Sequence, residues 1–412
     1  MNINEVKLAD LCEVITKGTT PSNIGAEFTN EGIKYIRSEM LTSSKYISED
    51  GFLYISEDTH HRLKRSQLKS GDILFSMAGV YLGKTAILRD CDVPSNTNQA
   101  VALIRVIPER CNREYVYHYL NLPEVVKSVN SITGQAAQPN INLKQIGNIP
   151  IKLPSKEKQD AIVSSISAYD DLIENNQKQI KLLEEAAQRL YKEWFVDLRF
   201  PGHETTPITD GIPKGWGLAC LDDVISKITT GLNPRKNFTL GVGKNYYVTI
   251  KNMANNSIYL NDKCDKVDDE AIEKINKRSD LQVGDILFSG IGTIGRVYMI
   301  DIPTNNWNVS ESVFTMRAND MISKEYLYLL LLSHDMQSYC DQNAHGVAQR
   351  GIRMADLRAY KFYLPNKSLL DSFTVIVKPL IEKTQHLRQQ ITLLEETRDR
   401  LLPKLMNGEI EV

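Results

Sequence analysis

One hexapeptide occurs twice in this chain. Gly-Asp-Ile-Leu-Phe-Ser stands at residues 71–76 and, unchanged, at residues 284–289. Other landmarks recur at an offset that drifts only from 213 to 211 residues. They are Leu8, Asp10, Gly18 and Pro21 with Leu221, Asp223, Gly231 and Pro234; Gly79 and Gly83 with Gly292 and Gly295; Glu114 and Tyr115 with Glu325 and Tyr326; and Leu182–Glu185 with Leu393–Glu396. The chain is therefore a tandem duplication of one unit about half its length, and not a solenoid, whose repeats have about 20–50 residues.

Each copy begins with mixed α and β structure. Short segments that are rich in β-branched and aromatic residues, and bounded by Gly, Asn and Asp, predict strands. They are 34–37, 72–76, 85–88 and 101–106 in the first copy, and 246–250, 285–289, 297–300 and 313–317 in the second. Leu, Tyr and Val at helical spacing predict helices over Arg113–Val129 and Lys324–Cys340.

A long amphipathic helix is predicted to close each copy. Over residues 156–195, apolar positions alternate in steps of four and three, which is the 3.5-residue period of a coiled-coil seam. This seam consists of Ile162, Ile166, Tyr169, Ile173, Asn176, Ile180, Leu183, Ala187, Leu190 and Trp194. The same steps in the second copy give Ile376, Leu380, Lys383, Leu387, Ile391, Leu394, Arg398, Leu401 and Leu405. Pro379 is expected to start or kink the second helix, and the first would be about 60 Å long.

The two seams of one chain are expected to pack on each other. Two repeated units most simply sit about a pseudo-twofold axis, which makes the paired helices antiparallel. Asn176 then either fixes the register of the pair or is merely tolerated near the surface. The predicted fold class is α+β, with two similar mixed α/β domains, each followed by a long helix, and the two helices packed as an antiparallel coiled coil.

Domain boundaries follow from this organisation. Residues 200–217 contain three prolines and four glycines, which predict a linker. Trp216 is expected to anchor the second copy. The predicted divisions are a first domain at 1–154, a long helix at 155–199, the linker at 200–217, a second domain at 218–365 and a C-terminal long helix at 366–412.

Charge and cysteine usage limit the class of protein. Lys and Arg number 49 and Asp and Glu 51, a net charge of −2, so a nucleic-acid binder must concentrate its basic residues on one face of each domain. The six cysteines form no CxxC pair, which excludes a zinc ribbon and predicts reduced thiols. The charged first residues indicate no signal peptide, and the longest apolar stretch, Tyr326–Leu332, is too short to span a membrane. We expect a cytoplasmic protein with no membrane partner.

No motif in the sequence supports catalysis or a metal site. Ala78–Thr85 ends in Gly-Lys-Thr like a phosphate loop, but alanine stands where the motif needs its first glycine. The second copy, Gly290–Val297, lacks both the lysine and the hydroxyl, which favours a glycine-rich turn between paired strands. HExxH, EF-hand and GxSxG patterns do not occur. We therefore expect a recognition protein with no catalytic residue, metal or cofactor of its own.

Basic residues gather with amides at matching positions of the two copies. Lys and Arg suit contacts to phosphates, and Asn, Gln and Arg suit contacts to base edges. For any single residue the alternative is a solvated loop. The candidates for contacting nucleic acid are Arg62, Lys64, Arg65, Lys69, Lys84, Asn96, Asn98, Gln99, Gln135, Gln138, Arg235, Lys236, Lys244, Asn245, Lys277, Arg278, Arg296, Gln349 and Arg350.

The order and doubling of these features resemble the specificity (S) subunit of type I restriction–modification enzymes. The matching landmarks are Leu8–Pro21 and Leu221–Pro234, the repeated hexapeptide, the Gly134–Gln138 patch, the Ile149–Pro154 segment before the first long helix, and the linker end Ile212–Trp216. The second copy departs from the pattern at Val347, which replaces a glutamine, and at Asn366–Leu370, which lacks a Glu/Gln pair.

The resemblance implies a function for each part. Each mixed α/β part would be a target recognition domain that reads one half of a split double-stranded DNA sequence. The long helices would space these domains and dock two methyltransferase (M) subunits, which bring S-adenosylmethionine and methylate adenine. Restriction (R) subunits would add translocation and cleavage with ATP and Mg. This chain would then hold no cofactor.

Two other functions remain open from the residues alone. A non-catalytic coiled-coil scaffold that binds proteins would suit the near-neutral charge, and a steep fall of DNA affinity with salt would exclude it. A nucleotide-dependent enzyme built on Gly83-Lys84-Thr85 would require nucleotide binding by the isolated chain.

Overall fold

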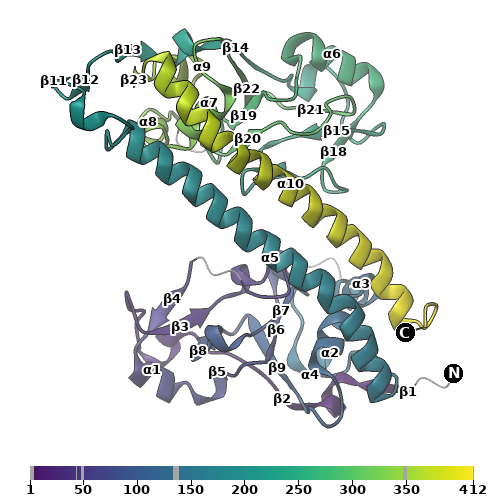
Figure 1. The fold of residues 1–412 in the computed structure, drawn as a ribbon. Helices are drawn as coiled ribbons and strands as arrows, with labels where there is room; N and C mark the ends of the chain where they lie inside the picture. The colour runs from purple at the N-terminus through teal and green to yellow at the C-terminus, as the bar shows by residue number, and fades with distance from the viewer. Residues whose placement is uncertain (1–3, 43, 48–50, 133–138, 347–349, 412) are drawn as a thin grey trace. The chain divides into compact units, whose positions relative to one another are not determined.

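The computed structural model describes residues 4–42, 44–47, 51–132, 139–346 and 350–411. The chain divides into two compact units, whose elements are labelled in Figure 1. Unit 1 comprises residues 1–177 and 390–412, and unit 2 comprises residues 178–389. Both divisions fall inside a long helix, so each unit holds one mixed α/β domain and a part of each long helix.

The domain of unit 1 is built on two four-stranded sheets. The first sheet is antiparallel, in the order β2 (Cys12–Lys17), β9 (Val101–Val106), β6 (Ile73–Ser76) and β7 (Thr85–Ile87). The second has the order β4 (Leu53–Ile55), β3 (Ile33–Ile36), β8 (Ser95–Thr97) and β5 (Gln67–Leu68), with β3 and β8 parallel. The four strands predicted for this copy are thereby confirmed to within one residue at either end.

Shorter elements complete unit 1. The antiparallel pair β1 (Asn4–Lys7) and β10 (Pro150–Leu153) leads into the first long helix. The short helices are α1 (Glu57–Arg62), α2 (Arg113–Leu120), α3 (Pro123–Ile132) and α4 (Leu143–Gly147), with the 3-10 helices η2 (Pro21–Ile24) and η4 (Lys64–Ser66).

Unit 2 repeats this topology, except that its second sheet has three strands instead of four. Its antiparallel sheet has the order β14 (Ile225–Thr230), β22 (Val313–Ala318), β19 (Ile286–Ser289) and β20 (Val297–Met299). Its second sheet has the order β18 (Asp265–Val267), β15 (Asn245–Val248) and β21 (Trp307–Val309), again with the last two parallel. Even the register shift in the first strand recurs, between Cys12 and Val14 and between Ile225 and Lys227. The repeat seen in the sequence is therefore a repeat of strand order.

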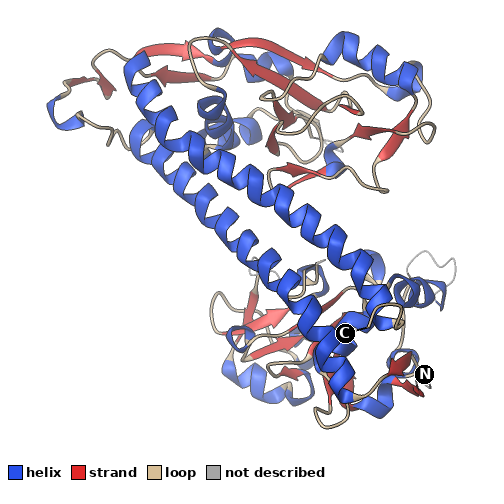
Figure 2. Ribbon diagram, turned by 45° about the vertical axis from the view of Figure 1, so that its right-hand side comes forward, coloured by secondary structure: helices blue, strands red, loops and turns tan. Residues whose placement is uncertain are grey.

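Unit 2 also contains shorter strand pairs and helices, coloured by type in Figure 2. Its strand pairs are β13 (Gly217–Cys220) with β23 (Lys361–Leu364), β11 (Ile208–Thr209) with β12 (Ile212–Pro213), and β16 (Met253–Ala254) with β17 (Ser257–Ile258). Its helices are α6 (Asp269–Ser279), α7 (Lys324–Leu332), α8 (His334–Gln342), α9 (Met354–Arg358) and the 3-10 helix η9 (Pro234–Lys236).

The repeated hexapeptide is preserved because its aspartate is buried. Asp72 accepts two hydrogen bonds from Arg105, both at 2.7 Å, and Asp285 accepts two from Arg317, at 2.6 and 2.8 Å. Each carboxylate also accepts a backbone N–H three residues earlier, at 2.7 and 2.9 Å. A buried carboxylate needs such partners, and Ile, Leu and Phe of the strand fill the core beside it.

Two predicted helices are each interrupted, which corrects the sequence interpretation. Arg113–Val129 is not one helix, because α2 ends at Leu120 and α3 starts at Pro123, whose missing N–H suits only the first turn of a helix. Lys324–Cys340 likewise divides at Ser333, whose side chain caps α8 by accepting the N–H of Met336.

The long helices α5 (Lys156–Phe195) and α10 (Lys367–Met406) each have 40 residues. The bounds of α5 agree with the prediction. Pro379 lies inside α10 and does not start it, because the helix begins at Lys367. The predicted seam positions of α5 are all buried or half-buried, whereas Leu172 and Leu182 outside the seam are exposed.

The seam predicted for the first half of α10 is wrong at two positions, although Leu380 is half-buried as expected. Ile376 is 46% exposed and Lys383 is exposed, while Phe373, Val377 and Thr384 are buried instead. These are the positions 211 residues after the seam residues Ile162, Ile166 and Ile173. Leu387, Ile391, Leu394 and Leu401 are buried or half-buried.

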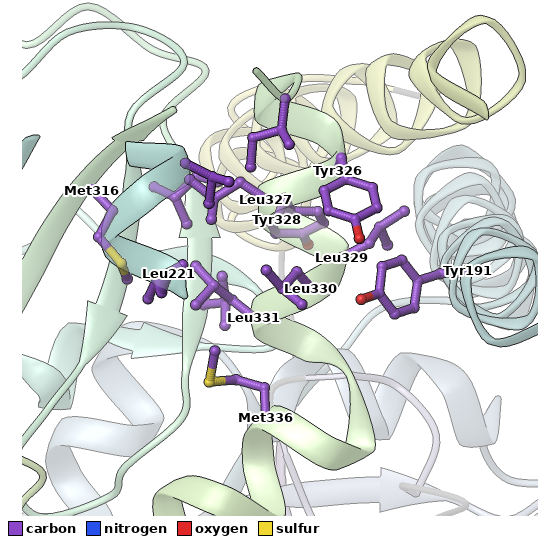
Figure 3. Packing of buried hydrophobic residues seen from close by; sticks show 14 of the residues in the cluster. Tyr191, Leu221, Met316, Tyr326, Leu327, Tyr328, Leu329, Leu330, Leu331 and Met336 are labelled. Atoms are coloured by element: carbon purple, nitrogen blue, oxygen red, sulfur yellow. The ribbon is translucent and has the colours of Figure 1, made fainter. Parts of the chain in front are cut away.

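Both long helices contribute to the core of each unit. In unit 1, Ile162 and Ile166 of α5 and Leu402 and Leu405 of α10 belong to one apolar cluster with the domain. In unit 2 the corresponding cluster is aromatic. Figure 3 shows Tyr191 of α5 directed toward Tyr326 of α7, with ring centroids 5.6 Å apart.

The linker packs onto the cluster of unit 2. The rings of Phe200 and Trp216 lie 5.5 Å apart, and Trp216 also packs against Phe195 at 6.1 Å. Trp216 therefore packs on the core of unit 2, as expected for a residue that anchors the second copy.

Candidate nucleic-acid interface

A loop of the same shape follows the first long strand of each domain. A Cβ added at Gly18 would lie 1.8 Å from the carbonyl oxygen of Thr97, and one at Gly231 would lie 1.6 Å from that of Val309. Only glycine allows the backbone to pass this close to the end of β8 or β21. Pro21 and the equivalent Pro234 then start the 3-10 helices η2 and η9, because a fixed φ suits a first helical turn.

A basic segment lies against this loop in both units. In unit 1, Arg62 of α1 donates to the carbonyl oxygen of Ile24 at 2.6 Å. In unit 2, Lys274 of α6 donates to the carbonyl oxygen of Asn237 at 3.0 Å. Arg62 and Lys274 are 212 residues apart, the offset of the repeat. We call the surface formed by η2, α1 and η4 in unit 1, and by η9 and α6 in unit 2, the loop–helix surface.

Most of the predicted nucleic-acid contacts on these surfaces are exposed cations. Unit 1 presents Arg62, Lys64 and Arg65, and unit 2 presents Arg235, Lys236, Lys277 and Arg278. Lys64 and Lys277 occupy equivalent positions, as do Arg65 and Arg278, because Lys-Arg-Ser stands at 64–66 and at 277–279. The side chain of Arg278 donates to Thr230 Oγ1 at 3.1 Å, and Lys244 at the edge of the surface lies 3.5 Å from Asp269 with both groups exposed. Solvent-exposed pairs of this kind are weak, so the cations are available to an anionic ligand.

Two residues that were predicted to contact nucleic acid, Asn96 and Asn245, instead have structural roles. Asn96 is fully buried and donates to the carbonyl oxygen of Leu63 at 3.2 Å and to Ser66 Oγ at 2.9 Å. Asn245 is buried and donates to Asp269 at 2.7 Å. Neither side chain can reach nucleic acid, because each already holds a basic helical segment in place.

The buried amide of unit 1 has a counterpart that sequence reasoning missed. Asn308 of β21 is buried and accepts a hydrogen bond from Ser279 Oγ at 2.8 Å. Asn96 and Asn308 are 212 residues apart, and Ser66 and Ser279 are 213 apart. The shared offset was the signal that could have identified this clamp between the basic segment and the sheet.

The other candidates are dispersed. Lys69 and Gln99 are exposed, Lys84 is half-buried, and Asn98 caps its own turn by accepting the N–H of Ala100 at 3.1 Å. Arg296 donates to the carbonyl oxygens of Ile250 and Met253, which ties it to the domain. Arg350 is exposed and donates to the carbonyl oxygen of Asp341 at 2.6 Å. Gln135, Gln138 and Gln349 lie outside the described residues.

The glycine-rich segment is a turn between paired strands, as predicted. Ser76 and Lys84 are joined by a backbone hydrogen bond of 2.8 Å, and β6 pairs with β7. Gly79 donates to the carbonyl oxygen of Pro139 at 3.0 Å, and Gly292 donates to that of Arg350 at 2.7 Å. In each unit the turn therefore borders the chain next to the predicted glutamine patch.

Among the described residues, no group of three His, Cys, Asp or Glu side chains could hold a metal ion. Burial raises the pKa of the Cys12, Cys111 and Cys340 thiols to about 12, so these thiols stay protonated and unreactive. A search of the described helices for one long and apolar enough to cross a membrane finds none.

The chain is similar in sequence and in fold to known proteins. The family model for the Type I restriction modification DNA specificity domain matches residues 2–185 and 213–393. The Type I restriction enzyme MjaIX specificity subunit of Methanocaldococcus jannaschii is 27% identical over 98% of this chain and 93% of that protein. The HindI specificity subunit of Haemophilus influenzae is 24% identical over 66% of this chain and 71% of that protein. A solved structure, the Type-I restriction-modification system S subunit from M. genitalium, has the same fold, with a TM-score of 0.55 and 16% identity over 98% of this chain and 96% of that one.

Proposed function

Because the chain belongs to the family of type I restriction–modification DNA specificity subunits, we propose that each of its two units reads one half of a bipartite DNA target. The chain is a DNA-recognition subunit and has no catalytic activity of its own. This membership decides against a scaffold that binds only proteins and against a nucleotide-dependent enzyme.

The observation that carries the proposal is the duplicated loop–helix surface. Each unit places exposed cations on a short helical segment that a buried Asn–Ser clamp holds against the sheet. Cations on a rigid support suit phosphate contacts that fix the register on DNA. They also provide the local positive charge that a chain of net charge −2 needs in order to bind a polyanion. The two surfaces differ in sequence, so the two half-sites differ as well.

The long helices act as an antiparallel coiled coil that spaces the recognition domains about a pseudo-twofold axis. The contacts inside each unit support this arrangement. Residues 170 and 176 of α5 contact residues 398 and 390 of α10 in unit 1, and residue 184 contacts residue 388 in unit 2. Residue numbers therefore increase along α5 as the numbers of their partners decrease along α10, which is the pattern of antiparallel helices. The resulting spacer places half-sites about one DNA turn, roughly 34 Å, apart.

The partners follow from membership in the family. Two methyltransferase subunits dock on the helices and bring S-adenosylmethionine, and restriction subunits bring ATP and Mg. The functional parts are the recognition domains 1–154 and 218–365, the helices 155–199 and 366–412, and the linker 200–217. The complex works in the cytoplasm, where its DNA lies.

Selection of bound duplexes from a random DNA library tests the proposal, with the chain in complex with its methyltransferase subunits. We expect one split motif with a constant spacer, because two linked domains bind far more tightly together than either does alone. An undivided motif, or no enriched sequence, would contradict the proposal.

Matched variants locate the contact. Lys64→Gln and Lys277→Gln should each weaken binding of all sequences and lower the slope of log affinity against log salt by about 1, as expected for one lost phosphate contact. The control is Arg189→Gln, since the 80% exposed side chain of Arg189 pairs only with Glu193 of its own helix. An unchanged slope in both test variants would remove the loop–helix surface from the interface.

A further inference from the structure

Unit 1 buries a cluster of charged side chains between its domain and both long helices. We call Lys45, Glu114, His118, Asp170 and Arg398 the ionic cluster. Asp170 of α5 lies 3.0 Å from Arg398 of α10, 3.4 Å from His118 of α2 and 3.9 Å from Lys45. Lys45 also pairs with Glu114 at 2.8 Å. The Asp170 side chain is 2% exposed and that of Lys45 is 5% exposed.

The cluster balances two cations against two carboxylates. His118 adds no charge, because burial and the neighbouring Lys45 and Arg398 lower its pKa to about 3. Burial raises the pKa of Asp170, although Arg398 and Lys45 partly oppose this effect. Removing charges from water is costly, and well-packed apolar residues in their place are often at least as stable. The cluster therefore needs a reason other than stability.

Unit 2 shows that the fold does not require these charges. At the positions 211 residues away, Leu329 replaces His118, Ile381 replaces Asp170 and Ala187 replaces Arg398. These three residues line a small cavity of about 20 Å³, whose lining also includes the ion pair of Glu184 and Arg388. The positions of Asp170 and Arg398 are thus charged in unit 1 and apolar in unit 2.

We propose that Asp170 and Arg398 are a positioning pair that permits only one pairing and register of the two long helices. If α5 paired with α5 of a second copy, Asp170 would face Ala187. If α10 paired with itself, Arg398 would face Ile381. A slip of α10 by one heptad would place Ile391 or Leu405 opposite Asp170. Each alternative buries a charge against an apolar side chain, and only the native register pairs both charges.

The inference rests on the proposed function, because the spacing of DNA half-sites depends on helix register. The first test is a double variant of the full chain, Asp170→Ile with Arg398→Ala. It places the residue types found at the equivalent positions of unit 2 into unit 1. We expect this double variant to fold and to form dimers at a fraction at least tenfold above that of the native chain by light scattering. In the DNA selection, with methyltransferase subunits bound, it should accept at least one additional spacer length.

A reciprocal variant covers the case in which the apolar one fails to fold. Ala187→Arg with Ile381→Asp adds the same ion pair to unit 2, so that self-paired helices can also pair Asp170 and Arg398. It too should raise the dimer fraction at least tenfold, whereas the control Arg189→Ala should leave it unchanged. Double variants that keep the native dimer fraction and the single native spacer would overturn the proposal. The light-scattering result does not involve DNA, so it stands even if the native chain selects no split motif.

Discussion

The two units have the same strand order but contact the long helices in different ways. In unit 1 the contact contains Asp170, His118 and Arg398, and in unit 2 the equivalent positions are apolar. Ile162 of the first seam corresponds to Phe373, whose ring lies 4.7 Å from that of Phe195. The comparison shows that the fold requires the shared strand order, whereas the residues that contact the long helices can differ.

What the units share lies inside the domains. Both have a glycine where the backbone passes a strand end, a buried aspartate–arginine pair in the hexapeptide strand, and an Asn–Ser clamp under the basic segment. Each shared feature satisfies a buried polar group or avoids a clash with backbone. Such groups have few substitutes, whereas an apolar contact can be repacked in many ways.

Truncation of the aromatic contact should have the largest effect. Phe373→Ala should lower the free energy of unfolding of unit 2 by about 3–5 kcal/mol, because a fully buried ring among four aromatic neighbours leaves a cavity. Tryptophan fluorescence in urea measures this effect selectively, since Trp194, Trp216 and Trp307 all lie in unit 2.

The control for this variant is on the same helix. Val375 is 75% exposed, so Val375→Ala should leave the transition unchanged. A Phe373→Ala protein with the native transition midpoint would mean that the aromatic contact does not stabilise unit 2.

The shared aspartates should have equal and intermediate effects. Asp72→Asn and Asp285→Asn keep the shape of the side chain but remove the charge that faces Arg105 or Arg317. Each should lower the free energy of unfolding of its unit by about 2–3 kcal/mol, the range for hydrogen bonds to charged groups. Far-UV circular dichroism in urea follows both units and tryptophan fluorescence follows unit 2, so the transition seen only by circular dichroism belongs to unit 1.

The matched control is Asp371→Asn, which breaks an ion pair with Lys367 in which both groups are 60% exposed. It should leave stability unchanged. A large effect of one aspartate variant and none of the other would show that the units are less equivalent than their topology.

Acid should lower the stability of unit 1 through His118, which has no counterpart in unit 2. This is the smallest of the predicted effects. The pKa of His118 is about 3 in the folded chain, below the ordinary value of 6.5, because the ring is buried near two cations. The unfolded chain therefore binds a proton below pH 6.5 that the folded chain excludes. Unit 1 should lose about 1.4 kcal/mol of stability for each pH unit below 6.5.

The variant His118→Leu, which carries the residue of unit 2, should lack this loss. The measurement is the difference in free energy of unfolding between native and variant chains at pH 7 and pH 5. The raised pKa of Asp170 stabilises the folded chain in acid, but it is present in both proteins and largely cancels. If the native and variant chains differ in stability by the same amount at pH 7 and pH 5, then His118 binds its proton equally in the folded and unfolded chains. That result would contradict the prediction.

The strands and the duplication could be read from the sequence because they depend on local patterns. Segments such as 72–76 and 285–289 combine β-branched and aromatic residues with flanking glycines. The break before Pro123 was also readable, since proline ends the preceding helical turn. The seam of α10 was not, because Val375, Ile376 and Val377 are all apolar and the step pattern cannot choose among them.

The interface was predictable only in part. An amide has the same sequence signature whether it faces DNA or caps the core, so Asn96 could be separated from Lys64 only by its burial. The ionic cluster could not be foreseen, because Lys45, Asp170 and Arg398 are far apart in the chain and burial of such charges is rare.

The division of the chain has a consequence for synthesis on the ribosome. Unit 2 is one continuous stretch, 178–389, while unit 1 needs the final residues 390–412 to finish its core. Unit 2 can therefore complete its folding during translation, but unit 1, although it is begun first, must wait for residues 390–412. Until then the face of α5 that carries Ile162 and Ile166 lacks its cover of Leu402 and Leu405. A message cut short before codon 390 would yield a folded unit 2 and a unit 1 with an exposed apolar surface on α5. Such a truncated chain should therefore aggregate.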